Sequence, residues 1–113
     1  MEEQLISFET AKLAKEKGFN WKVSLHYESN GNRFFDKVEC NFNNVELICS
    51  APTQSLLQKW LREVHKLIIT IDHVTSKGWC YRIQINNSDW SIYFKTYEEA
   101  LEKGLQEALK LIK

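Results

Sequence analysis

The sequence has few of the residues that mark secreted, disulfide-bonded or membrane-spanning proteins. Its three cysteines, Cys40, Cys49 and Cys80, are odd in number and far apart, so they suit neither a disulfide framework nor a paired zinc site. Residues 1–4 are acidic and lack the apolar stretch of a signal peptide, and no run approaches the roughly 18 apolar residues of a membrane span. We therefore expect reduced thiols, no membrane contact and a cytoplasmic location.

An excess of charge of either sign is also missing. The chain has 15 basic and 15 acidic residues, so no long-range field attracts it to nucleic acid or to an anionic membrane. Any electrostatic partner must therefore be bound by a local patch. Glycine is scarce as well, with 4 in 113 residues, which argues against a phosphate-cradling loop.

Apolar residues are plentiful. They make up 43% of the chain and include four Trp, four Tyr and six Phe. This is enough to offset the conformational entropy that keeps polar chains disordered. Because a second core would leave each half near the lower limit of independent stability, we predict one domain over residues 1–113 that folds without a cofactor.

Capping signals and apolar periodicity predict three helices. Ser7 is suited to N-cap a first helix that runs to about residue 17, where Gly18 suits a left-handed C-cap. Pro52 lies near the start of a second helix that ends at about residue 65. Thr96 and Glu99 form a capping box for the last helix, whose acidic first turn and basic end match the helix dipole.

Alternating residues predict the strands. Residues 21–27 alternate between apolar and polar, which is the pattern of a strand with one buried face. Residues 28–50 are rich in Asn and indicate a hairpin or an irregular excursion whose register the sequence leaves open.

Residues 67–74 and 79–85 form a predicted hairpin with Gly78 at the left-handed position of a three-residue loop. The expected pairs are Thr75 with Trp79, His73 with Tyr81, Ile71 with Ile83 and Ile69 with Ile85. A third strand is expected to place Trp90, Ile92 and Phe94 opposite Ile85, Ile83 and Tyr81, so that all three strands share one core face.

These elements predict an α+β fold in which an antiparallel sheet has helices packed on one face. From residue 52 onward the order is helix, three strands, helix, which is also the topology of double-stranded-RNA-binding domains. Those domains have a basic cluster at the start of their last helix, whereas Tyr97, Glu98 and Glu99 here would repel phosphates. The topology alone therefore does not favour RNA binding.

Two strings resemble a family of small uncharacterised proteins encoded in bacteriophage and prophage regions of bacterial genomes. They are SAPTQSLLQKWLREVHK at residues 50–66 and TYEEALEKGLQEALKLI at residues 96–112, and SFETAKLAKEKGFNW at residues 7–21 is similar to the beginning of the family. The strings cover roughly half of the chain. The resemblance implies an accessory role in a phage or mobile element and carries no activity or catalytic residues.

A polar sheet face is the first candidate binding site. If helices cover one face only, the other presents a mixed polar surface able to bind a protein, with Asp72 and Arg82 as a cross-strand ion pair. Its expected residues are Thr70, Asp72, Arg82, Gln84, Ser91 and Tyr93.

A basic helix edge is the second candidate. Lys59, Arg62 and Lys66 lie on one edge of the second helix and could bind nucleic acid through a few phosphates. Three charges give weak and salt-sensitive affinity, and a solvated helix face accounts for the same residues.

Catalytic signals are sparse. No two of the three histidines have the short spacing of a metal site; we expect His73 on the core face and His26 in solvent. A cation near Cys80 could lower the pKa of its thiol, but no histidine is expected beside it.

The aromatic residues are expected to divide between core and surface. We expect Trp21, Trp60 and Trp90 in the core, and Trp79 and Tyr93 are the better candidates for exposure.

The sequence therefore assigns no catalytic, cofactor-binding or metal-binding residue. The leading hypothesis is a non-enzymatic phage or prophage accessory protein that binds a host or phage protein through the polar sheet face. Weak nucleic-acid binding is the second hypothesis, and an enzyme using Cys80 is the third.

Overall fold

The computed structural model describes residues 4–84 and 89–112. This part of the chain forms three α-helices, one short 3₁₀ helix and five strands in two antiparallel sheets, so the predicted α+β class is confirmed. The elements are α1 (Phe8–Glu16), β1 (Val23–Glu28), β2 (Arg33–Cys40), η1 (Phe42–Asn44), β3 (Ile48–Ser50), α2 (Gln54–Val64), β4 (Ile69–Val74), β5 (Gly78–Ile83) and α3 (Tyr97–Lys110).

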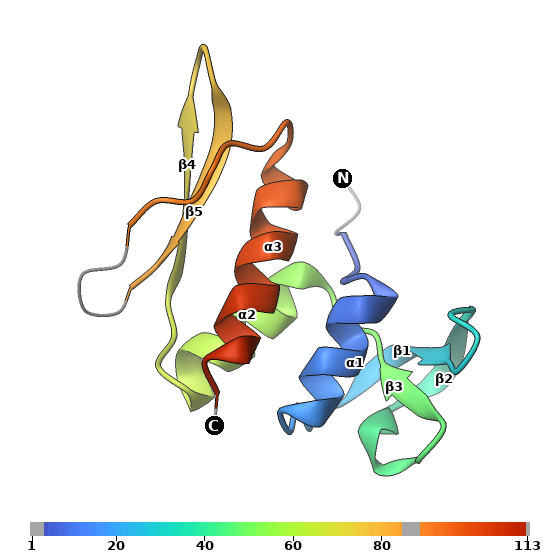
Figure 1. Cartoon of the computed structure of the whole chain (residues 1–113). Coiled ribbons are helices and arrows are strands. Elements are labelled where there is room, and N and C mark those ends of the chain that lie inside the picture. The colour runs from blue at the N-terminus through green and yellow to red at the C-terminus, as the bar shows by residue number, and fades with distance from the viewer. Residues whose placement is uncertain (1–3, 85–88, 113) are drawn as a thin grey trace.

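The helices lie between the two sheets (Figure 1). One sheet has the strand order β2-β1-β3, with α1 packed against β3, and the other is the β4–β5 hairpin, with α3 packed against both of its strands. Both α1 and α2 contact α3, which is therefore the central helix. The two sheets end up on opposite sides of the helical layer.

The helix ends follow the local signals in the sequence. The side chains of Ser7, Thr53 and Thr96 accept hydrogen bonds from backbone N–H groups three residues ahead, which caps all three α-helices. Ser7 and Thr96 were the predicted caps, whereas Thr53 follows the Pro52 that marked the second helix. Gly18, with φ of 93°, has the left-handed conformation expected of it after α1.

The Asn-rich stretch is ordered by side chains that bond to distant backbone. Asn43 of η1 donates from Nδ2 to the carbonyl of Phe19 and accepts at Oδ1 from the amide of Ser50, each at 2.8 Å. Ser50 in turn accepts from the amide of Phe42 at 3.1 Å. These hydrogen bonds help to hold β3 beside β1. They give the Asn side chains of residues 28–50, whose register the sequence left open, a structural role.

One cluster of buried apolar residues extends from Ile6 to Leu109 and includes side chains from both sheets and all three α-helices. Trp60 of α2 is fully inside it and lies edge-on to Phe19 at 5.3 Å between ring centroids, as predicted for a core residue. On the other side of α3, the lack of a side chain at Gly104 brings the helix against Ile69 and Tyr81. A Cβ at this position would lie 3.1 Å from the Ile69 Cγ2 atom.

The register of the β4–β5 hairpin differs from the prediction by two residues. Val74 pairs with Gly78, so the loop is Thr75–Lys77, and His73 faces Trp79 instead of Tyr81. Ile71 then faces Tyr81 and Ile69 faces Ile83. Because the shift is an even number, every side chain keeps its predicted face.

The hairpin register differs from the prediction because Gly78 has a different role from the one expected. Its φ is 114°, but it is the first residue of β5 and not part of the loop. A Cβ there would lie only 2.4 Å from the carbonyl oxygen of Phe94. Glycine is therefore needed for the close approach of a neighbouring segment, which the hairpin sequence alone does not reveal.

The predicted third strand is reduced to an extended segment beside β5. Phe94 pairs with Trp79 through two backbone hydrogen bonds of 2.8 and 2.6 Å, and the amide of Ser91 donates to the carbonyl of Tyr81 at 2.8 Å. The predicted partner of Phe94 was Tyr81, and the predicted pairing with Ile85 lies outside the described residues. Since α3 packs against β4 and β5, it leaves this segment uncovered, and Ile92 is 76% exposed.

A carboxylate joins the three helices. Glu102 of α3 accepts from the amide of Ser7 at 2.9 Å, from the hydroxyl of Thr10, and from the amide nitrogen of Gln54 at 2.9 Å. Gln106 also donates to the Thr10 hydroxyl, at 2.9 Å. Thr10 and Gln54 are buried, so these polar groups depend on each other for hydrogen bonds.

Replacing Glu102 with Ala should lower the free energy of unfolding by roughly 2–4 kcal/mol, because the buried Thr10 and Gln54 and the amide of Ser7 all lose an acceptor. Glu107→Ala is the matched control, since Glu107 lies on the same helix and forms ion pairs with the partly exposed Lys103 and Lys110. Its loss should cost less than about 1 kcal/mol. Equal losses in urea unfolding would contradict the role of Glu102.

Replacing Gly78 with Ala should detach the segment that carries Phe94 from β5. Gly18→Ala provides the control, because Gly18 also has a positive φ but has no atom within 4 Å of an added Cβ. Both variants should lose about 1–2 kcal/mol from backbone strain, and the Gly78 variant should lose at least about 1 kcal/mol more from the clash. Equal unfolding free energies for the two variants would contradict the close approach.

Candidate functional site

The outer face of the β4–β5 hairpin gathers most of the residues predicted for partner binding. Thr70 lies directly opposite Arg82, and Asp72 opposite Cys80, on the face that points away from α3. Gln84 donates from Nε2 to the Thr70 hydroxyl at 2.9 Å. Figure 1 shows the hairpin to one side of α3, with all three helices on the same side of it.

The segment after the hairpin extends this face. Ser91 accepts at Oγ from the amide of Tyr81 at 2.9 Å, so its side chain and its backbone both fix the segment to β5. Tyr93 is 44% exposed, in line with the sequence prediction, and the Lys77 ammonium lies 5.5 Å from the centroid of its ring. Ser91 therefore positions the segment, and Tyr93 is available for contact.

Trp90 belongs to the site, and the prediction that it lies in the core is wrong. Its ring is 42% exposed, and the Arg82 guanidinium lies over it at 4.9 Å from the ring centroid. The alternating pattern placed Trp90 inside because it assumed a full strand under α3. We define the hairpin face as the outer surface formed by Thr70, Asp72, Lys77, Arg82, Gln84, Trp90, Ser91 and Tyr93.

The expected ion pair between Asp72 and Arg82 does not form in the described structure. The register places Asp72 opposite Cys80, where its Oδ1 accepts from the amide of His73 at 2.9 Å, while Arg82 stacks on Trp90. The pairing failed because the hairpin loop starts one residue earlier than predicted. Each pairing thereby moves by two residues.

The surroundings of Cys80 do not favour the thiolate form. The residue is only 3% exposed, burial raises the pKa of its thiol, and the nearby Asp72 carboxylate raises the pKa further. The cation that the sequence placed beside it, Arg82, is instead over Trp90. The shift is opposite to the one that a nucleophilic cysteine needs.

The basic edge of α2 is partly neutralised. Lys59 lies 3.8 Å from the Glu63 carboxylate, and Lys66 donates from Nζ to the backbone carbonyl of Glu63 at 3.0 Å. Lys59 and Arg62 do line a shallow hollow of about 510 Å³ together with Thr53, Ser55, Leu56 and Gln58. Lys66 lies beyond the end of α2, in a left-handed conformation with φ of 59°, so the prediction that all three cations share one helix edge is wrong. Lys59 and Arg62 do lie on α2.

His26 is not solvated, contrary to the prediction. Its Nδ1 lies 2.8 Å from the Asp36 carboxylate, and its ring centroid lies 5.8 Å from that of Phe34 and 4.7 Å from that of Phe42. The 3₁₀ helix η1 brings Phe42 onto this face of the sheet, which the strand pattern alone did not indicate.

Asp36, His26 and Ser50 lie in that order across β2, β1 and β3, because His26 pairs with Ser50 in the sheet. The order is that of a hydrolytic triad, but Ser50 is buried and its Oγ accepts from the amide of Phe42. The hydroxyl is therefore not presented to a substrate. This polar row serves to fix three strands and η1.

His73 is exposed, although it was expected in the core. It keeps the predicted face, with its ring centroid 4.4 Å from that of Trp79, but it lies near the hairpin loop.

Between residues 4 and 112, leaving aside 85–88, no three His, Cys, Asp or Glu side chains are grouped as a metal ion would require. The same residues contain no helix long and apolar enough to cross a membrane.

No protein-family model matches this chain, and searches of curated proteins and of solved structures find no match either.

The three thiols should react with a disulfide reagent in a fixed order. Cys40 is half-buried and should react first near neutral pH, whereas Cys49 and Cys80 are buried and have raised pKa values, so both should react more slowly. Mass spectrometry of the labelled peptides gives the order. If Cys80 reacted faster than Cys40, the assignment of Cys80 as an inert buried thiol would fail.

Proposed function

We propose that this chain is a non-enzymatic binding protein that captures another protein through the hairpin face. The observation that carries the proposal is the pairing of exposed aromatic rings with cations, Arg82 on Trp90 and Lys77 near Tyr93, on a sheet face that α3 leaves uncovered. Arg, Trp and Tyr are the residues that contribute most to binding at protein interfaces.

The backbone beneath these side chains is well held, which favours binding. Ser91 and Phe94 fix the outer segment to β5, and Gly104 seats the hairpin closely on α3. Tyr93 and Trp90 are therefore presented on ordered backbone, so little loop entropy has to be lost when a partner binds.

The mixture of charges favours a protein over nucleic acid as the partner. Asp72 lies on the same face as Arg82, and Glu98 and Glu99 are exposed at the start of α3. The Glu63 carboxylate lies 3.8 Å from Lys59, and Lys66 lies beyond the end of α2, which weakens the alternative of nucleic-acid binding through Lys59, Arg62 and Lys66.

The biological setting that we propose is a bacteriophage or prophage accessory role in the cytoplasm, with a host or phage protein as the partner. It rests on the resemblance of residues 50–66 and 96–112 to proteins encoded in such regions. The activity would then be interference or adaptation by binding and would need no cofactor.

The test is capture of partners from a lysate of infected cells by the tagged chain, with Arg82→Ala/Tyr93→Ala compared to the parent. Truncating two interface anchors should reduce capture by at least about 30-fold, if each contributes roughly 1 kcal/mol or more. Tyr93 is exposed, Arg82 is half-buried and neither belongs to the buried core, so thermal unfolding should change little. Unchanged capture of the same protein by the double variant would end the proposal.

Lys59→Ala/Arg62→Ala is the matched control, because it removes two residues from the basic edge of α2 and leaves the hairpin face intact. Its capture of the partner should equal that of the parent chain, with or without nuclease. Recovery that depends on intact nucleic acid and is lost in this control would instead assign function to α2.

A further inference from the structure

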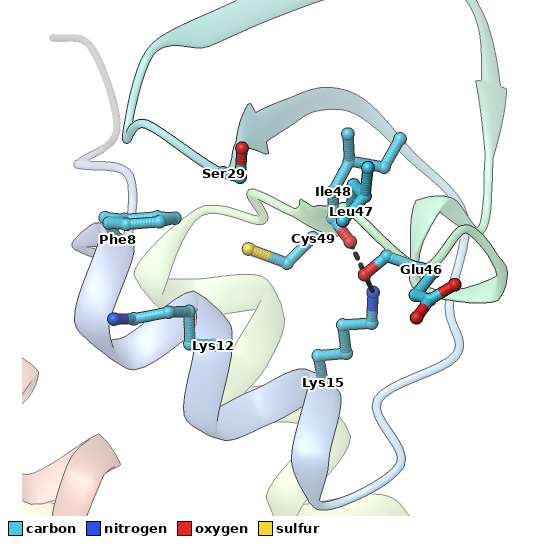
Figure 2. A pocket seen from close by; sticks show the side chains of 8 residues that line it. All are labelled: Phe8, Lys12, Lys15, Ser29, Glu46, Leu47, Ile48 and Cys49. Atoms are coloured by element: carbon cyan, nitrogen blue, oxygen red, sulfur yellow. Dashed lines mark hydrogen bonds between the residues drawn. The ribbon is translucent and has the colours of Figure 1, made fainter.

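A second surface lies on the other side of the helical layer, between α1 and β3. It is a pocket of about 270 Å³ whose lining residues come from α1, the residue after β1, the segment that leads into β3 and β3 itself (Figure 2). They are Phe8, Lys12, Lys15, Ser29, Glu46, Leu47, Ile48 and Cys49. The pocket shares no residue with the hairpin face.

One wall of the pocket is fixed by a lysine. Lys15 donates from Nζ to the backbone carbonyls of Val45, Glu46 and Ile48, the latter two at 2.9 and 2.6 Å. The segment before β3 is thereby tied to α1, and the shape of the pocket is set before any ligand binds. Carbonyl dipoles surround the Lys15 ammonium, but they do not cancel its charge.

A second cation lies one turn earlier on the same helix face. The Lys12 ammonium is 4.8 Å from the centroid of the Phe8 ring. In the described parts of the chain, neither Lys12 nor Lys15 forms an ion pair with a carboxylate. Glu46 also lines the pocket, but Figure 2 shows its carboxylate beyond Lys15, on the side away from Cys49.

The floor of the pocket is apolar and uncharged. Cys49 is only 4% exposed; burial raises the pKa of its thiol, whereas Lys15 and Lys12 act in the opposite direction. Phe8 is held by the ring of Tyr27 at 5.5 Å, and Ile48 and Leu47 complete an apolar lining.

We propose that the α1–β3 pocket binds a small amphipathic anion, with a carboxylate or phosphate head at the Lys12 ammonium and a short apolar body against Phe8 and Cys49. The Lys15 ammonium adds its positive charge, but its three N–H groups already donate to backbone carbonyls. Ser29 provides a hydroxyl at the rim that makes no hydrogen bond within residues 4–84 and 89–112 and can donate to the head group. The volume limits the ligand to a single ring or a short chain. The Lys12 cation would bind the head group, and the apolar floor would contact the body of such a molecule.

The test is a titration of the isotope-labelled chain followed by two-dimensional NMR. Benzoate and phenyl phosphate are the probes, and benzyl alcohol is the neutral counterpart of the same size. Saturable shifts of the amides of Lys12, Ser29 and Cys49 are expected with one or both anions, and the two arms separate a carboxylate site from a phosphate site. Equal affinity for benzyl alcohol, or no saturable shift with either anion, would overturn the proposal.

Lys12→Gln removes a charge from the pocket and should weaken binding of the preferred anion by about tenfold. Lys37→Gln is the matched control, because Lys37 is exposed on β2 and does not line the pocket; its affinity should equal that of the parent. Equal affinities for the two variants would contradict the assigned head-group position.

Protection of Cys49 gives an independent readout. The bound anion should slow alkylation of this thiol, while the rates at Cys40 and Cys80, which do not line the pocket, stay the same. Uniform slowing of all three thiols would show general stabilisation of the fold and would contradict occupancy of this pocket.

Discussion

The Glu102 carboxylate is the interaction on which the arrangement of the molecule depends. It receives hydrogen bonds from residues at the N-terminal ends of α1 and α2, and α3 carries it between them. A half-buried carboxylate between helices needs donors for its oxygens, and here the donors come from segments far apart in sequence. The contact therefore sets how the three helices lie relative to one another.

Two surfaces with different chemistry follow from that arrangement. On one side of the layer, α3 presents Gly104 to Ile69 and Tyr81 and covers only the inner side of the β4–β5 hairpin. Its outer side then carries cations stacked on aromatic rings, as proposed for a protein partner. On the other side, α1 and the segment tied to Lys15 enclose a cationic pocket with an apolar floor.

Local signals were predictable from the sequence, and contacts between distant segments were not. The caps at Ser7 and Thr96 depend on residues within one turn and were identified correctly. The placement of Thr70, Asp72 and Arg82 on the outer face was also correct, because the register error was even and left each strand residue on its face. The error itself came from Gly78, whose role depends on the carbonyl of Phe94.

Trp90 and His26 were misplaced for the same reason. Strand alternation says which residues share a face but not how far a helix covers that face, so Trp90 lies outside the core. His26 is covered by Phe42 of η1, and no periodic pattern in the sequence predicted that helix. The Glu102 contact with Ser7 spans 95 residues of sequence, and no local pattern could have indicated it.

The most direct test of the proposed partner surface is hydrogen–deuterium exchange of the chain alone and with its captured partner. The account predicts that the partner slows exchange in residues 77–84 and 89–94, where β5 and the adjoining segment lie beneath Arg82, Trp90 and Tyr93. Exchange in α2 should stay as it is in the free chain. Protection confined to α2, or to α1 and β3, with β5 unchanged, would contradict the hairpin face as the site of binding.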